Sequence, residues 1–182
     1  MVYDKEIVGK FVTLKSIGIE DAEFSYELRR DPRFVSIMGQ PASSLDNQKK
    51  YIERQREKEG DYYFVVYNRN KERIGLIGVY DILGESCETG REINVGQPYE
   101  TMEAEVLLLD FCLEVLKLKV FKSIVYKNNP KQYNMLKRRG GYTISEIIHN
   151  GIPAYLLETT FDEQKQRIEK IRVMIDKLEN KV

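Results

Sequence analysis

The chain has 182 residues, of which 42% are hydrophobic and 32% are charged, with 29 basic and 29 acidic side chains. This length and composition predict one soluble globular domain and are not typical of a disordered protein. Because the net charge is zero and no compact basic patch is present, neither nucleic acid nor an anionic membrane is expected as a partner.

The cysteines and the single histidine do not form a recognisable metal-binding or disulfide pattern. Cys87 and Cys112 are far apart in the sequence, and His149 is the only histidine. We therefore expect no metal and no disulfide framework. The N-terminal segment has no apolar signal core and no run is long enough to cross a membrane, so we expect a cytoplasmic protein.

The first third of the chain predicts one strand followed by two helices. The alternating segment KFVTLKSI predicts a strand over residues 10–17. GIEDAEFSYELRRDP, over residues 18–32, is typical of a helix that stops before its proline. Residues 43–60 predict a second helix, which begins at a serine or aspartate cap and ends at a glycine.

The middle of the chain predicts three strands and one long helix. The β-rich runs over residues 61–70 and 72–82 are joined by a polar turn and predict a hairpin. REINVGQP, over residues 91–98, predicts a further strand. TMEAEVLLLDFCLEVLKL, over residues 101–118, is the strongest helical pattern, with apolar side chains that include Cys112 on one face.

The following segments complete an alternating order of strands and helices. Residues 119–127 predict a strand, and residues 129–141 predict a helix that ends at glycine. Residues 142–161 contain Asn150-Gly151 between two β-rich runs, which predicts a hairpin with a type I′ turn. The order β-α-α-β-β-β-α-β-α-β-β predicts an α/β fold with a mixed sheet covered by helices.

The last segment, residues 163–182, predicts a C-terminal amphipathic helix that follows a domain over residues 1–162. Apolar residues recur in it at alternating spacings of three and four, as in a coiled-coil seam. They are Ile168, Ile171, Ile175, Leu178 and Val182. Two interpretations remain open: the helix packs this stripe on its own domain, or the stripe forms a homodimer contact.

Five segments together resemble a known family. They are LKSIGIEDAEFSYELRRDP, RIGLIGVYDI, REINVGQP, MEAEVLLLDFCLEVLKLKVFKSIVYKNNP and NGIPAYLLETTF. Their order and spacing resemble the GNAT superfamily of acetyl-CoA-dependent N-acetyltransferases, in the branch of ribosomal-protein alanine, spermidine and nucleotide-amino-sugar acetyltransferases. The resemblance implies a mixed, mostly antiparallel central sheet flanked by helices. It also implies acetyl-CoA as co-substrate and a small-molecule amine as acceptor, with a nucleotide-linked amino sugar as the favoured amine.

The resemblance implies where acetyl-CoA binds. In the family the fourth strand separates from the fifth, the pantetheine arm pairs with the fourth strand, and the pyrophosphate binds amides at the start of the next helix. By position, these contacts fall on Ile93, Asn94, Val95, Thr101, Met102, Glu103 and Asn129.

The segment after Pro98 departs from the family pattern. The family loop has the form Q/R-x-x-G-x-G/A, because glycines let backbone N–H groups approach phosphate oxygens. This chain reaches Glu103 without a glycine and carries Glu100 on the way. These glutamates either stabilise the start of the helix or repel a pyrophosphate.

Basic residues of the next predicted helix are either a solvated face or a substitute for the missing loop. They are Lys131, Lys137, Arg138 and Arg139. We therefore keep a second hypothesis beside the enzyme: a degenerate GNAT-fold binding or assembly module that no longer binds CoA in the usual way.

The chemistry requires a base for the amine, and Glu92 is the candidate because many relatives carry a glutamate on this strand. Burial at a sheet edge raises the pKa of a carboxyl group toward a useful value. The alternative for Glu92 is an ion pair with Arg91 or another cation on the surface. Glu88 is the second candidate if the strand begins earlier than residue 91, and His149 is interpreted as an exposed turn residue.

The acceptor is expected between the loop that joins the first two helices and the last hairpin. The candidates there are Arg29, Asp31, Phe34, Met38, Tyr80 and Tyr155. Among these, Arg29 is suited to a phosphate or carboxylate, and Asp31 is also explained as a turn residue before a proline.

Overall fold

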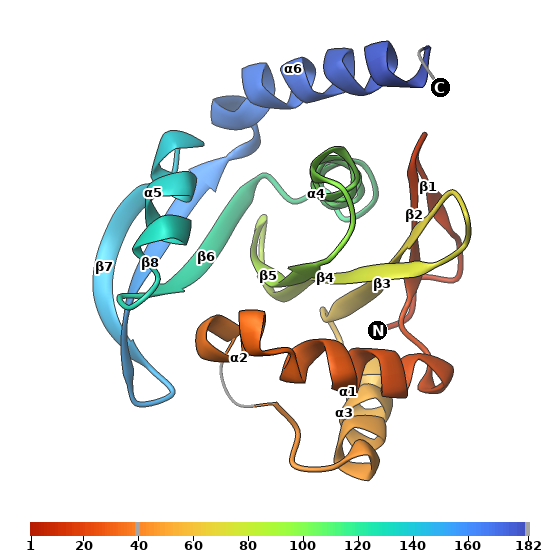
Figure 1. Ribbon diagram of the computed structural model, residues 1–182. Helices are drawn as coiled ribbons and strands as arrows, with labels where there is room; N and C mark the ends of the chain where they lie inside the picture. Colours follow the sequence, from red (N-terminus) through yellow and green to blue (C-terminus); the bar gives the residue numbers. More distant parts are fainter. Residues whose placement is uncertain (39–40, 181–182) are drawn as a thin grey trace.

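The computed structural model describes residues 1–38 and 41–180, with the side chains of 36–38 outside the description. One sheet lies between two layers of helices (Figure 1). Its strands are β1 (Ile7–Val8), β2 (Val12–Ser16), β3 (Tyr62–Asn68), β4 (Arg73–Leu83), β5 (Ser86–Asn94), β6 (Val120–Tyr126), β7 (Tyr142–His149) and β8 (Ile152–Thr160). The strand order β1-β2-β3-β4-β5-β6-β8-β7 is antiparallel except between β5 and β6.

The helices divide between the two faces of the sheet. They are α1 (Ala22–Arg30), α2 (Pro32–Met38), α3 (Leu45–Glu57), α4 (Pro98–Asp110), α5 (Pro130–Arg138) and α6 (Phe161–Glu179). In Figure 1, α1, α2 and α3 lie on one side of the sheet, and α4 and α6 lie on the other. The predicted α/β fold with a mostly antiparallel mixed sheet is confirmed.

Each layer of helices has its own hydrophobic core. On the α4 side, Phe111 packs edge-on against Phe64 with ring centroids 5.4 Å apart, and Cys87 and Cys112 are buried in the same cluster. On the α1–α3 side, Ile52 of α3 and Ile93 of β5 belong to a second cluster. Cys112 therefore occupies the core position that the sequence predicted.

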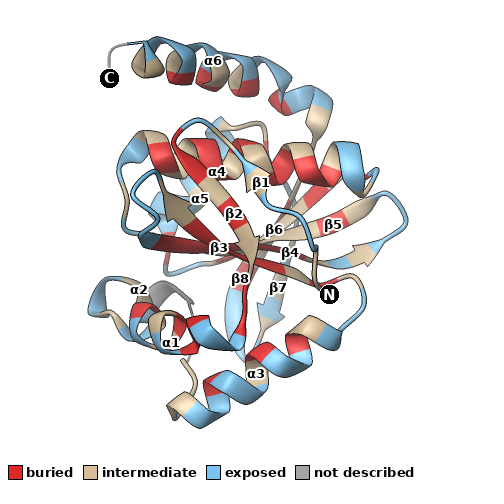
Figure 2. Cartoon of the chain, turned by 90° about the vertical axis from the view of Figure 1, so that its right-hand side faces the viewer, coloured by how far each residue is buried: buried red, intermediate tan, exposed pale blue. Residues whose placement is uncertain are grey.

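The C-terminal helix packs its apolar stripe on the rest of the chain. Ile168, Ile171 and Ile175 are 1%, 7% and 4% exposed and belong to the α4-side core. Figure 2 shows the buried positions of α6 along its inner face. The first interpretation of the stripe is confirmed, and the face assigned to a homodimer contact lies inside this chain; Val182 is outside the described residues.

Three differences between the structure and the predicted elements affect the surroundings of the site. β5 begins at Ser86, five residues before the predicted strand, because residues 86–90 pair with β4 although only Cys87 among them is strongly apolar. α4 begins at Pro98, where a proline at the first helical position costs no hydrogen bond. For the same reason, Pro32 opens the short helix α2 rather than only ending α1.

The hairpin of β7 and β8 forms as predicted. Asn150 and Gly151 have φ angles of 51° and 78°, and β7 and β8 pair on either side of them. Positive φ at both central residues is what a type I′ turn requires.

Candidate active site

A cleft of about 540 Å³ opens where β5 and β6 separate. The two strands pair in parallel only over Ser86–Glu88 and Val120–Lys122. Beyond Glu88 the edge of β5 faces the cleft instead of β6, so its backbone groups are available to a ligand that lies along the strand. The separation of strands that the resemblance implied is therefore present.

A β-bulge in β5 directs neighbouring side chains to opposite faces of the sheet, and the cleft has a mouth on each face. The mouth on the α1–α3 side, where the acceptor residues are predicted, is called here the acceptor mouth, and the mouth on the α4 side is called the donor mouth. Gly90 pairs with Gly78 and Ile93 with Leu76, so Arg91 and Glu92 together face the single residue between. Arg91 has a φ of 53°. Such bulges re-aim side chains at the edge of pairing, and here Arg91 turns to the α1–α3 side while Glu92 turns to the α4 side.

The segment that joins β5 to α4 uses its own backbone donors. The N–H of Val95 donates to the carbonyl of Ile74 at 2.8 Å, and that of Gly96 to Asn94 Oδ1 at 2.7 Å. The N–H of Gln97 donates to Glu100 Oε2 at 2.7 Å, and that of Thr101 donates to the Gln97 carbonyl. These groups are not free to cradle a phosphate.

The two glutamates at the start of α4 face away from the cleft into structural contacts. Glu103 is 4% exposed and accepts the N–H groups of Lys10, Phe11 and Val12 at 2.7 to 2.8 Å. Glu100 is 8% exposed and caps the helix through Gln97. Neither carboxylate lines the cleft, so neither lies directly against a pyrophosphate bound there.

Among the predicted donor-binding residues, some line the cleft and others do not. Ile93, Asn94, Thr101 and Asn129 line it, whereas Val95, Met102 and Glu103 do not. The Asn129 side chain caps α5, because its Oδ1 accepts the Gln132 N–H at 3.1 Å. Met102 packs against the α4-side core.

Glu88 stands at the last paired position before the strands separate and is held by a tyrosine. The Tyr80 hydroxyl donates to Glu88 Oε1 at 2.8 Å. Burial raises the pKa of Glu88, and Asp81 adds to this, while Tyr80, His149 and Arg91 act in the opposite direction. Burial and Glu88 also raise the pKa of Tyr80, which keeps it protonated and a donor.

Glu92 lies at the other mouth, in a cluster of four charges. Glu105 of α4 accepts Arg139 of α5 at 2.6 Å and Arg167 of α6 at 2.7 Å. Glu92 reaches solvent through the open cleft. Desolvation by the residues that line the cleft and the negative charge of Glu105 raise the pKa of Glu92 to about 7. The positive charges of Arg139 and Arg167 act to lower this pKa. Glu92 does not pair with Arg91.

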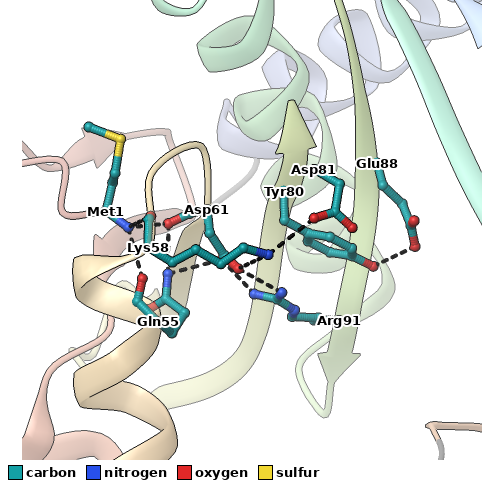
Figure 3. A network of polar contacts seen from close by, with 8 residues as sticks. All are labelled: Met1, Gln55, Lys58, Asp61, Tyr80, Asp81, Glu88 and Arg91. Atoms are coloured by element: carbon teal, nitrogen blue, oxygen red, sulfur yellow. Dashed lines mark hydrogen bonds and ion pairs between the residues drawn. The ribbon is translucent and has the colours of Figure 1, made fainter. Parts of the chain in front are cut away.

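Arg91 links Asp61 to the pair formed by Tyr80 and Glu88 (Figure 3). Its guanidinium donates to both carboxylate oxygens of Asp61, at 2.6 and 2.8 Å. It also lies over the Tyr80 ring, 4.0 Å from the centroid. Asp61 is 2% exposed, and these bonds hold its pKa below the ordinary value although burial acts to raise it. The side chains of Arg91, Tyr80 and Glu88 thus support one another.

The predicted acceptor residues are only partly brought together. Arg29, Phe34 and Tyr80 line the cleft. Asp31 instead binds Arg33 at the start of α2, and Tyr155 stacks on Tyr133 with centroids 4.5 Å apart, outside the cleft lining. The side chain of Met38 is outside the described residues.

Two cleft residues, His149 and Arg91, were given another role from sequence. His149 lines the cleft and lies beside Tyr126, with ring centroids 5.9 Å apart, so it is more than an exposed turn residue. Arg91 appeared only as an ion-pair partner. The glycine at position 90, directly before the predicted strand, was the available signal of a bulge.

The described part of the chain contains neither a metal-ligand cluster nor a membrane-crossing helix. No group of three or more His, Cys, Asp or Glu side chains has the arrangement of a metal site there. Within the same residues, none of the helices combines the length and apolar character that a membrane crossing needs.

Comparisons with known proteins agree with this geometry. The family model described as "Acetyltransferase (GNAT) domain" matches residues 12–141. No curated protein matches the sequence. Among solved structures, a GCN5-related N-acetyltransferase from Brucella melitensis has a TM-score of 0.78 at 12% identity, and covers 95% of this chain and 86% of its own.

Two further structures share the fold at low identity. The spermidine N-acetyltransferase of Vibrio cholerae, solved with CoA and spermine, has a TM-score of 0.72 at 18% identity, over 84% of this chain and 97% of its own. FdhC, described as a nucleotide-linked sugar GNAT, has a TM-score of 0.75 at 17% identity, over 93% of this chain and 97% of its own.

Proposed function

We propose, since the chain belongs to the acetyltransferase (GNAT) domain family, that it transfers an acetyl group from acetyl-CoA to the primary amine of a small molecule. The observation that carries the proposal is the cleft between β5 and β6, which has a free strand edge and a carboxylate at each mouth. Members of this family use acetyl-CoA, and the free edge of β5 suits an extended pantetheine arm.

The acceptor enters from the mouth bordered by α1, α2 and the β7–β8 turn. Arg29 and Phe34 belong to this mouth, and Glu88 lies at its inner end beside Tyr80. We assign Glu88 as the group that receives the proton of the amine, because it faces the acceptor and its pKa is raised. Glu92, the candidate from sequence, faces the donor mouth and is tested beside it.

The reaction then needs few other groups. An ammonium ion loses one proton to Glu88, and the amine nitrogen attacks the thioester carbonyl carbon. A backbone N–H at the bulge of β5 polarises the carbonyl oxygen. The C–N bond forms, the C–S bond breaks, and the departing thiolate takes the second proton of the nitrogen.

The phosphates of the donor need a site other than the closed loop before α4. Lys131 and Arg139 line the cleft, whereas Lys137 and Arg138 do not. The Arg139 guanidinium, which also binds Glu105, is a hydrogen-bond donor in the cleft lining and suits a phosphate oxygen. We assign Lys131 and Arg139 to the pyrophosphate.

The second candidate function is a binding module without CoA, and the closed loop before α4 favours it. Calorimetric titration with acetyl-CoA and with CoA separates the two. The enzyme requires binding in the micromolar range, followed by release of free thiol when an amine is added. Absence of binding at millimolar ligand would reject the acetyltransferase proposal and leave the binding module.

A further inference from the structure

A second cavity of about 400 Å³, called here the arginine pocket, adjoins the acceptor mouth. It lies between α1, α3 and the bulge of β5. It is lined by Arg29, Pro41, Ala42, Ser43, Asn47, Gln48, Tyr51, Arg54 and Arg91. Arg29 and Arg91 line both this pocket and the cleft, so the two cavities are contiguous.

The arginine pocket is rich in hydrogen-bond donors and poor in negative charge. Three of its nine lining residues are arginines, and none is Asp or Glu. Asp61 forms an ion pair with Arg91 and neutralises its charge. Neither Arg29 nor Arg54 forms an ion pair among the described residues. The pocket therefore holds two excess positive charges.

A buried polar atom lies at the base of the same region. Tyr63 is 1% exposed, and its hydroxyl has no hydrogen-bond partner within the described structure. Burial raises the pKa of Tyr63 to about 12, with Arg29 and Arg91 acting to lower it and Tyr51 to raise it. The Arg91 guanidinium, which lines the pocket, lies 5.5 Å from the centroid of the Tyr63 ring.

We propose that the acceptor carries an oxyanion, a phosphate or a carboxylate, and that this group binds in the arginine pocket through Arg29 and Arg54 while the amine lies at Glu88. The proposal rests on the proposed function and narrows its substrate class. Guanidinium groups bind such oxyanions through paired hydrogen bonds.

The arrangement of the two cavities indicates where the amine and the anionic group of the acceptor lie. Arg91 borders the pocket, its guanidinium lies over the Tyr80 ring, and the Tyr80 hydroxyl binds Glu88. The side chains of Tyr80 and Arg91 therefore lie between Glu88 and the pocket. A small molecule with an amine at one end and an anionic group at the other, such as a phosphorylated or nucleotide-linked amino sugar, suits this arrangement.

The same features disfavour a polyamine, which the Vibrio cholerae neighbour binds. A polycation in the acceptor mouth would meet Arg29 and Arg91, with only Glu88 to attract it. Glu85 pairs with Lys119 on the surface at 2.5 Å, and Glu92 faces the donor mouth. Glu85, Glu88 and Glu92 therefore do not form one acidic site.

The first test measures anion binding without any reaction. Calorimetric titration of the whole chain with inorganic pyrophosphate is compared for the unchanged pocket, Arg29→Ala, Arg54→Ala and Arg30→Ala, each in the Lys131→Ala, Arg139→Ala background, so that the phosphate site assigned to the donor does not contribute. Each pocket variant is expected to weaken binding about 10- to 100-fold, the cost of losing hydrogen bonds to a charged group. Arg30→Ala is the control, because Arg30 adjoins Arg29 but lies outside the pocket, over the Tyr26 ring.

A second measurement separates this inference from the proposed function. Release of thiol from acetyl-CoA is followed with glucosamine, glucosamine 6-phosphate and spermidine, in the wild type and in Arg54→Ala. Preference for the phosphorylated amine, lost in Arg54→Ala, supports the inference. Preference for spermidine would overturn it while leaving the acetyltransferase intact. If no amine reacts but pyrophosphate binding depends on Arg29 and Arg54, the pocket assignment stands and the enzymatic proposal fails. Equal pyrophosphate binding by all four proteins would overturn the pocket.

Discussion

Glu88 and Glu92 are four positions apart on one strand, yet they face opposite mouths of the cleft. In a regular strand this spacing would put them on the same face. The bulge at Arg91 inserts one residue and reverses the alternation. Their pKa values are raised by different neighbours, Asp81 in one case and Glu105 in the other, in addition to burial. The two carboxylates therefore have separable roles.

Replacement of Glu88 by Gln should lower kcat/KM by about 10² to 10⁴, the usual contribution of a general base. The same change should abolish the rise of activity with pH at the acid side of the profile, because that rise reports ionisation of Glu88. The measurement is the pH profile of thiol release in both proteins. An unchanged acid limb in Glu88→Gln, with the loss found in Glu92→Gln instead, would return the base to Glu92.

The raised pKa of Glu92 predicts a pH-dependent stability of the ligand-free protein. Its pKa is about 7 in the fold against an ordinary value of 4.5, so the fold favours the protonated carboxyl. Ionisation therefore begins to cost stability as pH rises above 4.5, and the cost is complete above 7. Because water in the cleft solvates the carboxylate, the effect is smaller than the full shift implies.

Glu92→Gln should accordingly raise Tm at pH 8 and leave it unchanged at pH 4, as measured by thermal unfolding. Glu85→Gln is the control, since Glu85 is on the surface beside Lys119. A Glu92→Gln protein whose Tm equals that of the wild type at both pH values would contradict the assigned pKa.

Asp61 and Arg91 form the buried ion pair on which the acceptor mouth depends. Asp61→Asn should lower the free energy of unfolding at pH 7 by about 3 kcal/mol, because it leaves a buried guanidinium without its partner. The pKa of Asp61 is held below 3.8, so its contribution is complete above that pH and is lost as pH falls further. Urea unfolding should show a constant difference between the two proteins from pH 7 down to the ordinary pKa of 3.8, and a difference that shrinks as the pH falls below that value. A difference that stays unchanged well below this pKa would exclude the ionic origin.

At the scale of elements, most of the fold followed from periodicity and turn chemistry. The long helix, the Asn150-Gly151 hairpin and the C-terminal stripe were each specified by local residues. The start of β5 was not, because SCETG has little β-propensity and is placed by pairing with β4. This shift of five residues decided the site, since it put Glu88 inside the strand.

The stripe of α6 should behave as core. Ile168→Ala is expected to cost about 2 to 5 kcal/mol of unfolding free energy, because Ile168 is 1% exposed and its removal leaves a cavity. Val173→Ala is the matched control on the same helix, where Val173 is 49% exposed and the cost should be small. Urea unfolding measures both. Equal, small costs would mean that α6 does not pack as described.

At the scale of the whole molecule, α6 does more than cover a face. It brings Arg167 to Glu105, so three helices meet at the donor mouth through α4, α5 and α6. The sequence indicated the absent glycines after Pro98 but not what the loop does instead. Its closure depends on side chains such as Asn94 and Glu100 that fold back on their own backbone. Such short-range competition for donors is not visible in a spacing pattern.

The backbone donors of the loop before α4 are already used within the chain, so the phosphates of acetyl-CoA must bind elsewhere. If Lys131 and Arg139 replace the loop, the double change Lys131→Ala, Arg139→Ala should weaken acetyl-CoA binding by about tenfold or more, the cost of lost charge-assisted hydrogen bonds. It should leave binding of S-acetylpantetheine unchanged, because that fragment lacks the phosphates.

The control is Lys137→Ala, Arg138→Ala, which removes the same charge from the same helix outside the cleft. Calorimetric titration at low and at moderate salt distinguishes the two sites, since contacts with phosphate weaken as salt increases. An equal loss of acetyl-CoA binding in both double variants would indicate only the general positive electrostatic field of α5. Loss of S-acetylpantetheine binding together with acetyl-CoA would mean that the change disturbed the cleft itself, and the phosphate assignment would then fall.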